Sequence, residues 1–293
     1  MTVAFVLSGG GSYGAMQVGM LRALTTRGVQ PDLVVGASVG ALNGAFYVAE
    51  PSLANVDRLV ELWRELERHE RFPIVDGRLK PWRLGRRNHV FPLRPWWLVR
   101  AVLGRQNHLV DNAALTAFLR ERLPLRRFED ARVPFHVVAT DVLDGEEVVF
   151  TSGDALPAVL ASSALPGIFP PVPVRGQWLV DGGVADNTPI DCAARAGATE
   201  IYVLPAGIGQ RLHTVPRTAL GSGAHALGLL IEQRLNAAVH HHALIPGLTL
   251  RVAPSTPVHV LPLDFSSTSE LIDAGERHTG EWLDRGAPAE GGA

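Results

Sequence analysis

The sequence contains one cysteine, Cys192, among its 293 residues. A single thiol excludes an intramolecular disulfide framework and any metal centre built from several cysteines. An excess of one charge is also missing, since 27 Lys and Arg face 29 Asp and Glu. Nucleic-acid binding favours a strongly basic chain, so no nucleic-acid partner is expected. Cys192 stands in an apolar run and is expected to fill the core.

No segment has the pattern of a signal peptide or of a membrane-spanning helix. The first apolar run, Val3–Leu7, is short and has no basic residues before it. The longest uncharged stretch, residues 33–49, approaches the length of a membrane span. Its three glycines, serine and asparagine favour a buried strand, a tight turn and a buried helix instead. We therefore expect a soluble, cytoplasmic protein that is at most peripheral to the membrane, and secretion by an unorthodox route stays open as an alternative.

The order of apolar patterns predicts an α/β fold. Val3–Leu7 and residues 33–35 have the composition of buried strands, and residues 12–27 between them repeat apolar residues at helical spacing. This βαβ start predicts a three-layer sandwich with helices on both faces of a central, mostly parallel sheet. Further strands are expected over residues 135–139, 147–151, 177–180, 200–204 and 248–252. Further helices are expected over residues 57–68, 112–121, 154–162, 189–196, 220–243 and 269–284.

The segment from residue 77 to residue 110 differs from the rest in composition. It holds eight basic side chains, no Asp or Glu, and three of the six tryptophans. Arg and Trp together suit an anionic membrane interface, whereas the alternative is an insertion packed on the domain with solvated or paired arginines. We expect one α/β domain over residues 1–285 with a basic, Trp-rich insertion or lid at about 70–110. Residues 286–293 are expected to form a disordered tail.

The first glycine motif is Gly9-Gly10-Gly11-Ser12-Tyr13-Gly14, between the first strand and the first helix. Such glycines let successive backbone N–H groups turn toward one point, where the helix N-terminus adds partial positive charge. The resulting nest suits a phosphate or a developing oxyanion. A dinucleotide-binding loop has a similar pattern but needs an acid at the end of the second strand, where Ser38 stands here. An oxyanion hole is therefore favoured, and no cofactor is expected.

The second motif, Gly36-Ala37-Ser38-Val39-Gly40, follows the second strand and opens an uncharged helix. This is the nucleophile-elbow pattern, in which small neighbours allow a sharp turn that presents the serine. A Gly- and Ser-rich turn that merely joins two buried elements is the alternative. The strand–turn–helix context and the nest upstream favour Ser38 as a nucleophile. An ordinary α/β-hydrolase is disfavoured, because its elbow follows several strands rather than the second.

A serine nucleophile needs a group that accepts its proton, and Asp181 is the candidate. Asp181 ends an apolar strand, where α/β sheets place their sites, and Gly182 and Gly183 after it leave room for close approach. The alternative is an ordinary Asp-Gly-Gly turn. An aspartate with its usual pKa of about 3.9 is a weak base, so such a pair depends on positioning and desolvation.

The eleven histidines offer no recognisable triad context, although a catalytic histidine stays open as an alternative. His240, His241 and His242 are consecutive, and neighbouring helix positions point about 100° apart, so the three cannot converge on one ion. We expect them to form a partly solvated helix face. No metal site is expected.

Four motifs in this order resemble the patatin-like phospholipase family, in its bacterial form. They are the glycine-rich loop continuing to Leu21, the elbow motif, Ala161-Ser162-Ser163-Ala164-Leu165-Pro166, and Asp181-Gly182-Gly183 followed by Asn187-x-Pro189. The resemblance is convincing over residues 1–50 and 130–205. It implies a Ser–Asp dyad without histidine, with Ser38 as nucleophile, Asp181 as base and the Gly9–Gly14 amides as the oxyanion hole. Tyr13 departs from the family pattern, because that loop position is often basic.

The resemblance implies a serine lipid acyl hydrolase that cleaves carboxylic esters of phospholipids or related acyl lipids. The alternative is a non-catalytic lipid- or membrane-binding protein on the same fold. The expected partners are a lipid substrate and, transiently, an anionic membrane surface. Some members of the family need an activating partner, and the sequence leaves this open here.

Overall fold

The computed structural model describes residues 1–68, 74–75, 78–79, 107–108, 110–206, 219–256 and 264–290. An eight-stranded sheet is central, with hydrogen-bonded neighbours in the order β10-β9-β1-β2-β5-β8-β7, and with β6 also paired to β5. Strands β10, β9, β1, β2 and β5 are parallel, and β6, β7 and β8 are antiparallel additions. The strands are β1 Val3–Leu7, β2 Leu33–Ala37, β5 Phe135–Asp141, β6 Glu147–Phe150, β7 Val172–Val174, β8 Gln177–Asp181, β9 Glu200–Leu204 and β10 Thr249–Val252.

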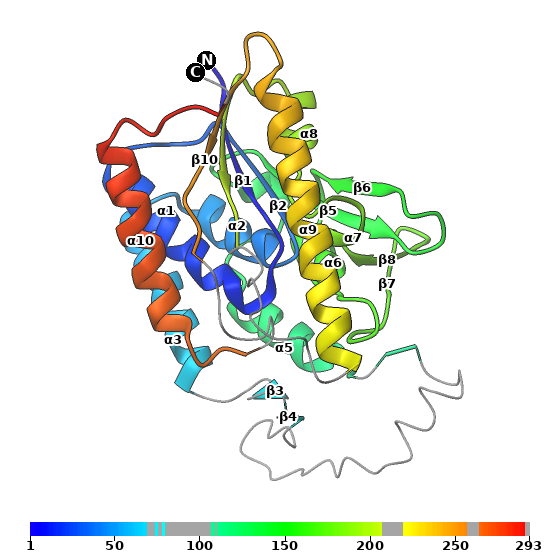
Figure 1. The fold of residues 1–293 in the computed structure, drawn as a ribbon. Coiled ribbons are helices and arrows are strands. Elements are labelled where there is room, and N and C mark those ends of the chain that lie inside the picture. Colours follow the sequence, from blue (N-terminus) through cyan, green and yellow to red (C-terminus); the bar gives the residue numbers. More distant parts are fainter. Residues whose placement is uncertain are drawn as a thin grey trace.

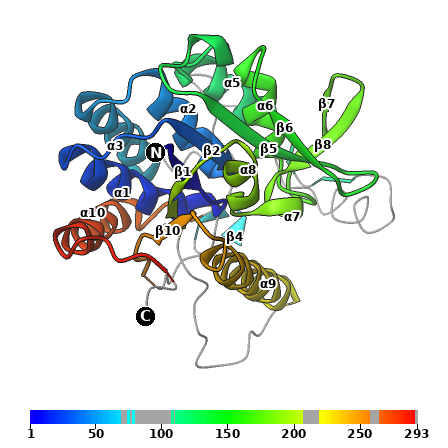
Figure 2. The same cartoon turned by 90° about the horizontal axis from the view of Figure 1, so that it is seen from above.

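Helices cover both faces of this sheet, as Figures 1 and 2 show. Alternation along β1 supplies both layers, because Phe5 and Leu7 enter one apolar core and Ala4 and Val6 the other. Helices α1, α2, α3 and α10 pack on the first core, and α8 and the C-terminal half of α9 on the second. The helices are η1 Gly11–Tyr13, α1 Gly14–Thr26, α2 Val39–Ala49, α3 Leu53–Arg68, α5 Ala113–Arg122, η2 Phe128–Asp130, α6 Ala155–Ser162, α7 Gly183–Asp186, α8 Ile190–Arg195, α9 Ala219–Ala243 and α10 Thr268–Asp284.

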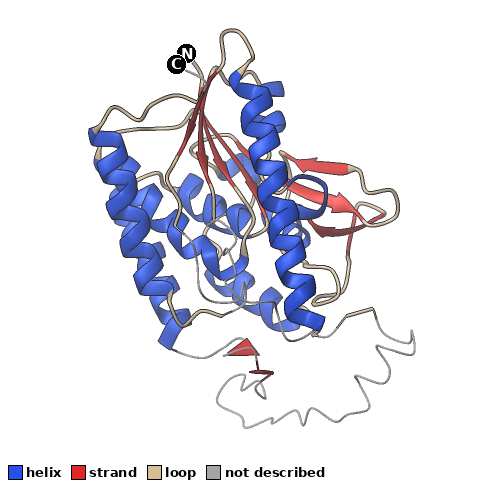
Figure 3. Ribbon diagram, in the orientation of Figure 1, coloured by secondary structure: helices blue, strands red, loops and turns tan. Residues whose placement is uncertain are grey.

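The expected three-layer α/β fold with a mostly parallel sheet is confirmed, and Figure 3 shows its layers. Cys192 is buried in the second core, as expected. Two short elements, β7 and α7, were not predicted, because three or four residues are too few to show a periodicity. The expected insertion at about 70–110 falls mostly outside the described residues. Its described part includes a small antiparallel pair, β3 Ile74–Val75 with β4 Arg78–Leu79.

The structure describes residues 286–290 of the expected C-terminal tail. Ala287 is buried, and the Glu290 N–H donates to the Leu250 carbonyl at 2.8 Å. Backbone groups that continue the edge of β10 give this segment partners; residues 291–293 lie outside the described residues. The partly solvated helix face expected for the three histidines is found at His240 and His241, which are exposed, whereas His242 is buried. Its buried ring lies between Asp191, with Nε2 2.9 Å from Oδ1, and the Ala238 carbonyl, 2.8 Å from Nδ1.

Strand β5 aligns two other strands along one of its edges. Thr140 pairs with β6 and also with β8, so β6 and β8 lie on opposite edges of β5. Val138 pairs with β6 and also with β2, so β2 lies opposite β6 as well. Strands β2 and β8 therefore share one edge of β5. Because β2 is parallel to β5 and β8 is antiparallel, the two strands run toward each other along that edge.

The registers show where these two strands meet. Strand β2 ends at Ala37 opposite Val138, and β8 ends at Asp181 opposite Ala139. Since Val138 and Ala139 are consecutive, the two strand ends meet without a gap. The residue after Ala37 is Ser38, which therefore leaves β2 next to Asp181.

A buried polar network holds α1, α2 and α3 together behind this junction. Asn43 donates through Nδ2 to the Gly14 carbonyl at 2.9 Å and to Gln17 Oε1 at 3.0 Å. The Trp63 indole N–H donates to Asn43 Oδ1 at 3.0 Å. Gln17 in turn donates to the Ser8 carbonyl at 2.8 Å, at the start of the glycine-rich loop. One asparagine thus fixes three helices and, through Gln17, the exit of β1.

We expect Asn43→Ala to lower the free energy of unfolding by about 2–4 kcal/mol, because Trp63 Nε1 and Gln17 Oε1 would stay buried without partners. Urea unfolding followed by circular dichroism measures this. The exposed Asn236→Ala on α9 is the matched control and should change stability by less than about 0.5 kcal/mol. Equal stability of the two variants would contradict the role of the network.

Candidate active site

Ser38 sits in a strained turn at the start of α2. Its backbone angles, φ 55° and ψ −125°, are unfavourable for a residue with a side chain. The turn is fixed by close packing, since a Cβ on Gly40 would lie 2.1 Å from the Leu7 carbonyl oxygen. Gly36 and Ala37 end β2, while Val39 and Gly40 begin α2, as the elbow motif predicts for strand, turn and helix. Such a turn lifts the serine side chain out of the regular elements.

A second serine anchors this turn to β5. The Ser38 N–H donates to Ser162 Oγ at 2.8 Å, and the Ser162 hydroxyl donates to the Val138 carbonyl at 2.6 Å. Ser162 ends α6 and is fully buried. Its neighbour Ser163 makes a longer contact, 3.5 Å from Oγ to the Ser38 carbonyl. The sequence analysis placed Ser162 in a motif without assigning it a role, and only the fold reveals that it meets the elbow.

The Asp181 carboxylate accepts a short hydrogen bond from the Ser38 hydroxyl, with Oγ 2.6 Å from Oδ2. Its other oxygen, Oδ1, accepts the Gly183 N–H at 2.8 Å, and its backbone carbonyl accepts the Thr140 hydroxyl at 2.9 Å. The Gly182 N–H donates to the Ser162 carbonyl at 3.2 Å, which ties the base motif to the same helix end. Both oxygens of the carboxylate are therefore held in place.

Burial raises the pKa of Asp181 to about 6, although the hydrogen bonds from Ser38 and Gly183 favour the ionised form. The carboxylate is 5% exposed. At neutral pH it is mainly ionised, and it is a stronger base than an aspartate in water. The structure therefore supplies the desolvation that the sequence analysis required of such a pair.

The glycine-rich loop lies directly beside Ser38. A Cβ on Gly9 would stand 3.1 Å from Ser38 Cβ and 2.4 Å from Asn187 Oδ1, so only glycine fits there. Asn187 holds the loop in two ways. Its carbonyl accepts the Gly9 N–H at 2.9 Å, and its side-chain amide donates to the Gly9 carbonyl at 3.3 Å. Because Asn187 follows α7, the loop and the base motif are braced against each other.

The loop amides divide into two groups. The N–H of Gly9 donates to Asn187, that of Tyr13 to the Gly10 carbonyl, and that of Gly14 to carbonyls of η1. For the N–H groups of Gly10 and Gly11, the described residues provide no acceptor. Among the described residues, the N–H groups of Gly10 and Gly11 therefore keep the capacity to donate to a further acceptor. Tyr13 stays neutral at physiological pH, since burial and the nearby Asp264 raise the pKa of its phenol to about 12.

The histidines and possible metal ligands of the described residues do not join this site. Within the described ranges, no histidine bonds to Ser38 or Asp181; His136, for example, faces Cys192 with Nδ1 3.7 Å from Sγ. A search of the same ranges finds no cluster of three or more His, Cys, Asp and Glu side chains suited to a metal ion. The described helices include none of the length and apolarity that a bilayer crossing needs.

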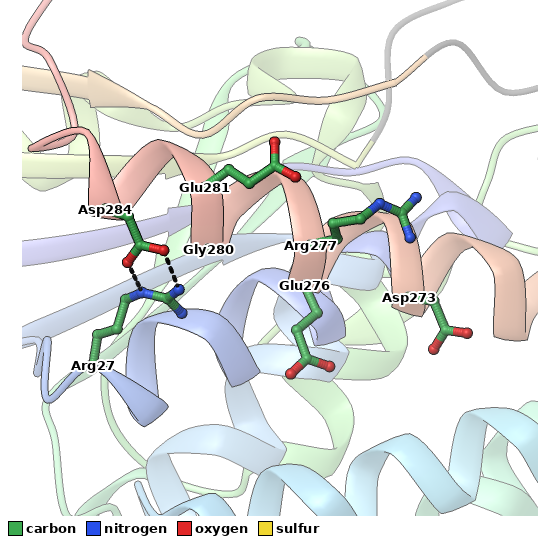
Figure 4. Close-up of a pocket in the computed structure, with 7 residues that line it drawn as sticks. All are labelled: Arg27, Asp273, Glu276, Arg277, Gly280, Glu281 and Asp284. Atoms are coloured by element: carbon green, nitrogen blue, oxygen red, sulfur yellow. Dashed lines mark hydrogen bonds and ion pairs between the residues drawn. The ribbon is translucent and has the colours of Figure 1, made fainter.

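An open groove of about 520 Å³ lies along α10 beside the end of α1 (Figure 4), and neither Ser38 nor Asp181 is among the residues that line it. Charged side chains line it, and Arg27 forms a two-pronged ion pair with Asp284 at one end, at 2.8 and 2.9 Å. Such walls do not suit an acyl chain. Its lining residues are Arg27, Asp273, Glu276, Arg277, Gly280, Glu281 and Asp284.

The fold and this site define an α/β protein with an elbow serine held against a buried aspartate. The family described as patatin-like phospholipase matches residues 5–194. The chain belongs to the patatin-like phospholipase family.

The chain is similar to several known proteins, of which three are described here. Patatin-like phospholipase domain-containing protein 7 of Mus musculus is 29% identical over 207 residues, which cover 70% of this chain and 14% of that protein. Lysophospholipase NTE1 of Mycosarcoma maydis is 29% identical over 215 residues, which cover 71% of this chain and 10% of that protein. The chain thus spans about one seventh or less of these relatives' length. The crystal structure of VipD from Legionella pneumophila aligns over 97% of this chain and 67% of VipD, with 15% identity and a TM-score of 0.47.

The bridge through Ser162 gives a testable expectation. Ser162→Ala removes the acceptor of the Ser38 N–H and frees the strained turn, so kcat for a soluble ester should fall about tenfold or more with KM nearly unchanged. Steady-state kinetics measures both constants. Ser163→Ala, one residue further on, should stay within about threefold of the parent protein. Equal effects of the two substitutions would contradict the anchoring role of Ser162.

Proposed function

We propose that this chain is a serine lipid acyl hydrolase that cleaves carboxylic ester bonds of phospholipids or related acyl lipids. The observation that carries the proposal is the 2.6 Å hydrogen bond from Ser38 Oγ to the buried Asp181 carboxylate, made at a nucleophile elbow. Membership of the patatin-like phospholipase family supports a lipid ester as substrate. The name lysophospholipase, carried by one relative, points to the same bond class.

In the proposed acylation step, Asp181 Oδ2 takes the hydroxyl proton while Ser38 Oγ forms a bond to the ester carbonyl carbon. The carbonyl π electrons move onto its oxygen, where the N–H groups of Gly10 and Gly11 would stabilise the negative charge. A well-placed donor of this kind contributes about 2.7–4 kcal/mol in other enzymes. When the tetrahedral intermediate collapses, the C–O bond to the alcohol breaks. The departing alkoxide takes the proton back from Asp181, and an acyl ester remains on Ser38.

Deacylation repeats the sequence with water. Asp181 accepts a proton from water as the water oxygen attacks the acyl carbon, and the same two amides face the oxyanion. Collapse breaks the bond to Ser38 Oγ, which regains its proton from Asp181. The fatty acid leaves, and the free dyad is restored.

One carboxylate can serve in both steps because of its surroundings. A pKa of about 6 leaves Asp181 ionised at neutral pH yet basic enough to hold a proton briefly. The Gly183 N–H on Oδ1 leaves Oδ2 for the serine. An imidazole between acid and serine is not needed in this geometry, since the acid already contacts the hydroxyl.

The first test is covalent labelling with a fluorophosphonate, read by peptide mass spectrometry. We expect an adduct on Ser38 and none in Ser38→Ala. Asp181→Asn keeps the shape but loses the base, so labelling and ester hydrolysis should slow by about 10²–10⁴-fold. Asp144→Asn, in an exposed turn, is the control and should match the parent. A parent protein that is neither labelled nor active would instead favour the non-catalytic lipid-binding alternative.

The second test is the pH dependence of kcat/KM on a soluble ester. The ionised form of Asp181 is the active one, so activity should fall as the pH drops through about 6, approaching tenfold per unit below pH 5. Burial also raises the pKa of Asp186 to about 6, so Asp186→Asn is the necessary control and should retain this limb. If the fall in kcat/KM at low pH disappears in Asp186→Asn, the titrating group is Asp186 and not Asp181, which contradicts the mechanism.

A further inference from the structure

Five large apolar side chains stand exposed near the end of the sheet that holds Ser38 and Asp181, where the parallel strands have their carboxyl ends. Their exposed fractions are 44% for Val142, 83% for Leu143, 51% for Trp178, 47% for Val184 and 63% for Leu230. We call these five residues the apolar edge surface. They come from the turn after β5, from β8, from α7 and from α9.

Alternation along the strands puts several of these side chains on the same face of the sheet. Leu179 points into the core beneath α6, so Trp178 before it points to the opposite face, toward α7 and α8. The Val142 N–H donates to the Trp178 carbonyl at 2.9 Å, which places the two residues side by side. Helix α7, which carries Val184, packs on that face as well, where the Ala185 N–H donates to Thr140 Oγ1 at 3.1 Å.

Helix α9 brings the last member to this group. Arg234 Nη1 donates to the carbonyls of Val184 and Ala185, at 3.0 and 3.1 Å. Leu230 is four residues earlier, so it lies on the same side of α9, one turn nearer the carboxyl ends of the parallel strands. Figure 1 shows α9 passing α7, with its first half continuing toward the carboxyl ends of the strands. Residues 219–231 contain no Asp, Glu, Lys or Arg, so no charge interrupts this half of the helix.

The apolar edge surface adjoins the catalytic base. Trp178 is three residues before Asp181 on β8, and Val184 is three residues after it on α7. The proposed substrates gather in bilayers and micelles, so the enzyme must meet them at an interface. Exposed apolar groups with a tryptophan among them suit insertion at the level of lipid headgroups. The exposed acids of the same turn, Asp144 and Glu146, give no attraction to an anionic surface.

We propose that the apolar edge surface is where this protein docks onto a lipid aggregate, by burying these side chains among the lipids. This inference rests on the proposed lipid acyl hydrolase function. Binding at this surface comes from the burial of apolar side chains and is separate from any binding by the basic, Trp-rich segment. It does not weaken as the salt concentration rises. Docking here turns the end of the sheet that holds Ser38 and Asp181 toward the lipid.

Vesicle flotation tests the assignment. The Ser38→Ala protein, which cannot turn over lipid in the proposed mechanism, is floated with phosphatidylcholine vesicles at 0.1 and 0.5 M salt. We expect a triple variant, Leu143→Ser, Trp178→Ser and Leu230→Ser in that background, to lose at least tenfold in partition coefficient at both salt concentrations. Melting curves check its folding, and Leu143→Ser alone, at the most exposed position, should still lose about threefold.

The matched control removes three apolar side chains at the opposite edge of the sheet: Leu53→Ser, Leu244→Ser and Ile245→Ser. These residues are 38%, 69% and 37% exposed and lie where α3 begins and where α9 ends, beside the amino ends of the strands. The control should stay within twofold of the parent. Equal losses in the two triples, unchanged flotation of the first, or no flotation of the parent would overturn the proposal. So would a parent that self-associates through these residues and ignores vesicles, as measured by light scattering.

The same variants separate this inference from the proposed function. For this test Ser38 is kept. The variant with Leu143→Ser, Trp178→Ser and Leu230→Ser should then hydrolyse a soluble short-chain ester as the parent does and lose activity only on vesicles. If the parent hydrolyses no ester but floats in a way that depends on these three residues, the docking surface stands and the proposed function fails. If hydrolysis of vesicle lipid is unchanged in the triple, the function stands and the docking surface fails.

Discussion

The candidate site depends on two strands ending head to head along one edge of β5. Strand β2 carries the chain to Ser38 and β8 carries it to Asp181, and the register leaves consecutive positions of β5 opposite their last residues. Two backbone ladders thus fix the separation of two side chains that are 143 positions apart. A shift of one residue in either ladder would turn the side chain to the other face of the sheet. The 2.6 Å hydrogen bond is a consequence of the register.

Burial of the acid opposes stability and favours reactivity at once. A desolvated carboxylate is costly unless it is hydrogen-bonded, and here its two oxygens accept from Ser38 and Gly183. These bonds lower the pKa that burial raises, so the balance of about 6 reflects both. The strained elbow shows a similar balance, since Ser162 and the close packing at Gly40 hold an angle that Ser38 would avoid by itself. Neither feature would persist on a less rigid framework.

Much of this arrangement could be predicted from the sequence, and the failures have physical causes. Long elements were predicted because burial leaves a clear periodicity, and the elbow serine and the strand-end aspartate stand in motifs with a local cause. The meeting of β2 and β8 could not be predicted, because a ladder register has no signature in one strand alone. The division of the loop amides depends on Asn187, which is distant in sequence, and the buried His242 bonds to Asp191 on α8, 51 positions earlier. What the sequence analysis missed was mainly pairings between distant segments.

The two halves of the dyad belong to different parts of the sheet. Ser38 follows a strand in the parallel part, flanked by β1 and braced by the Asn43 network behind it. Asp181 ends an antiparallel strand near the other margin and leads into α7, which Arg234 links to the half of α9 that exposes apolar side chains. The turn that carries the partly buried Ser38 is thus braced by the core, and the buried Asp181 stands on the segment that leads to the apolar edge surface. If a lipid aggregate meets the protein at that surface, the segments it contacts include β8 and α7, the two that hold Asp181. The serine turn and Asp181 are in turn tied together, because β2 and β8 both pair with β5 and because Ser162 bonds to Ser38 and to Gly182.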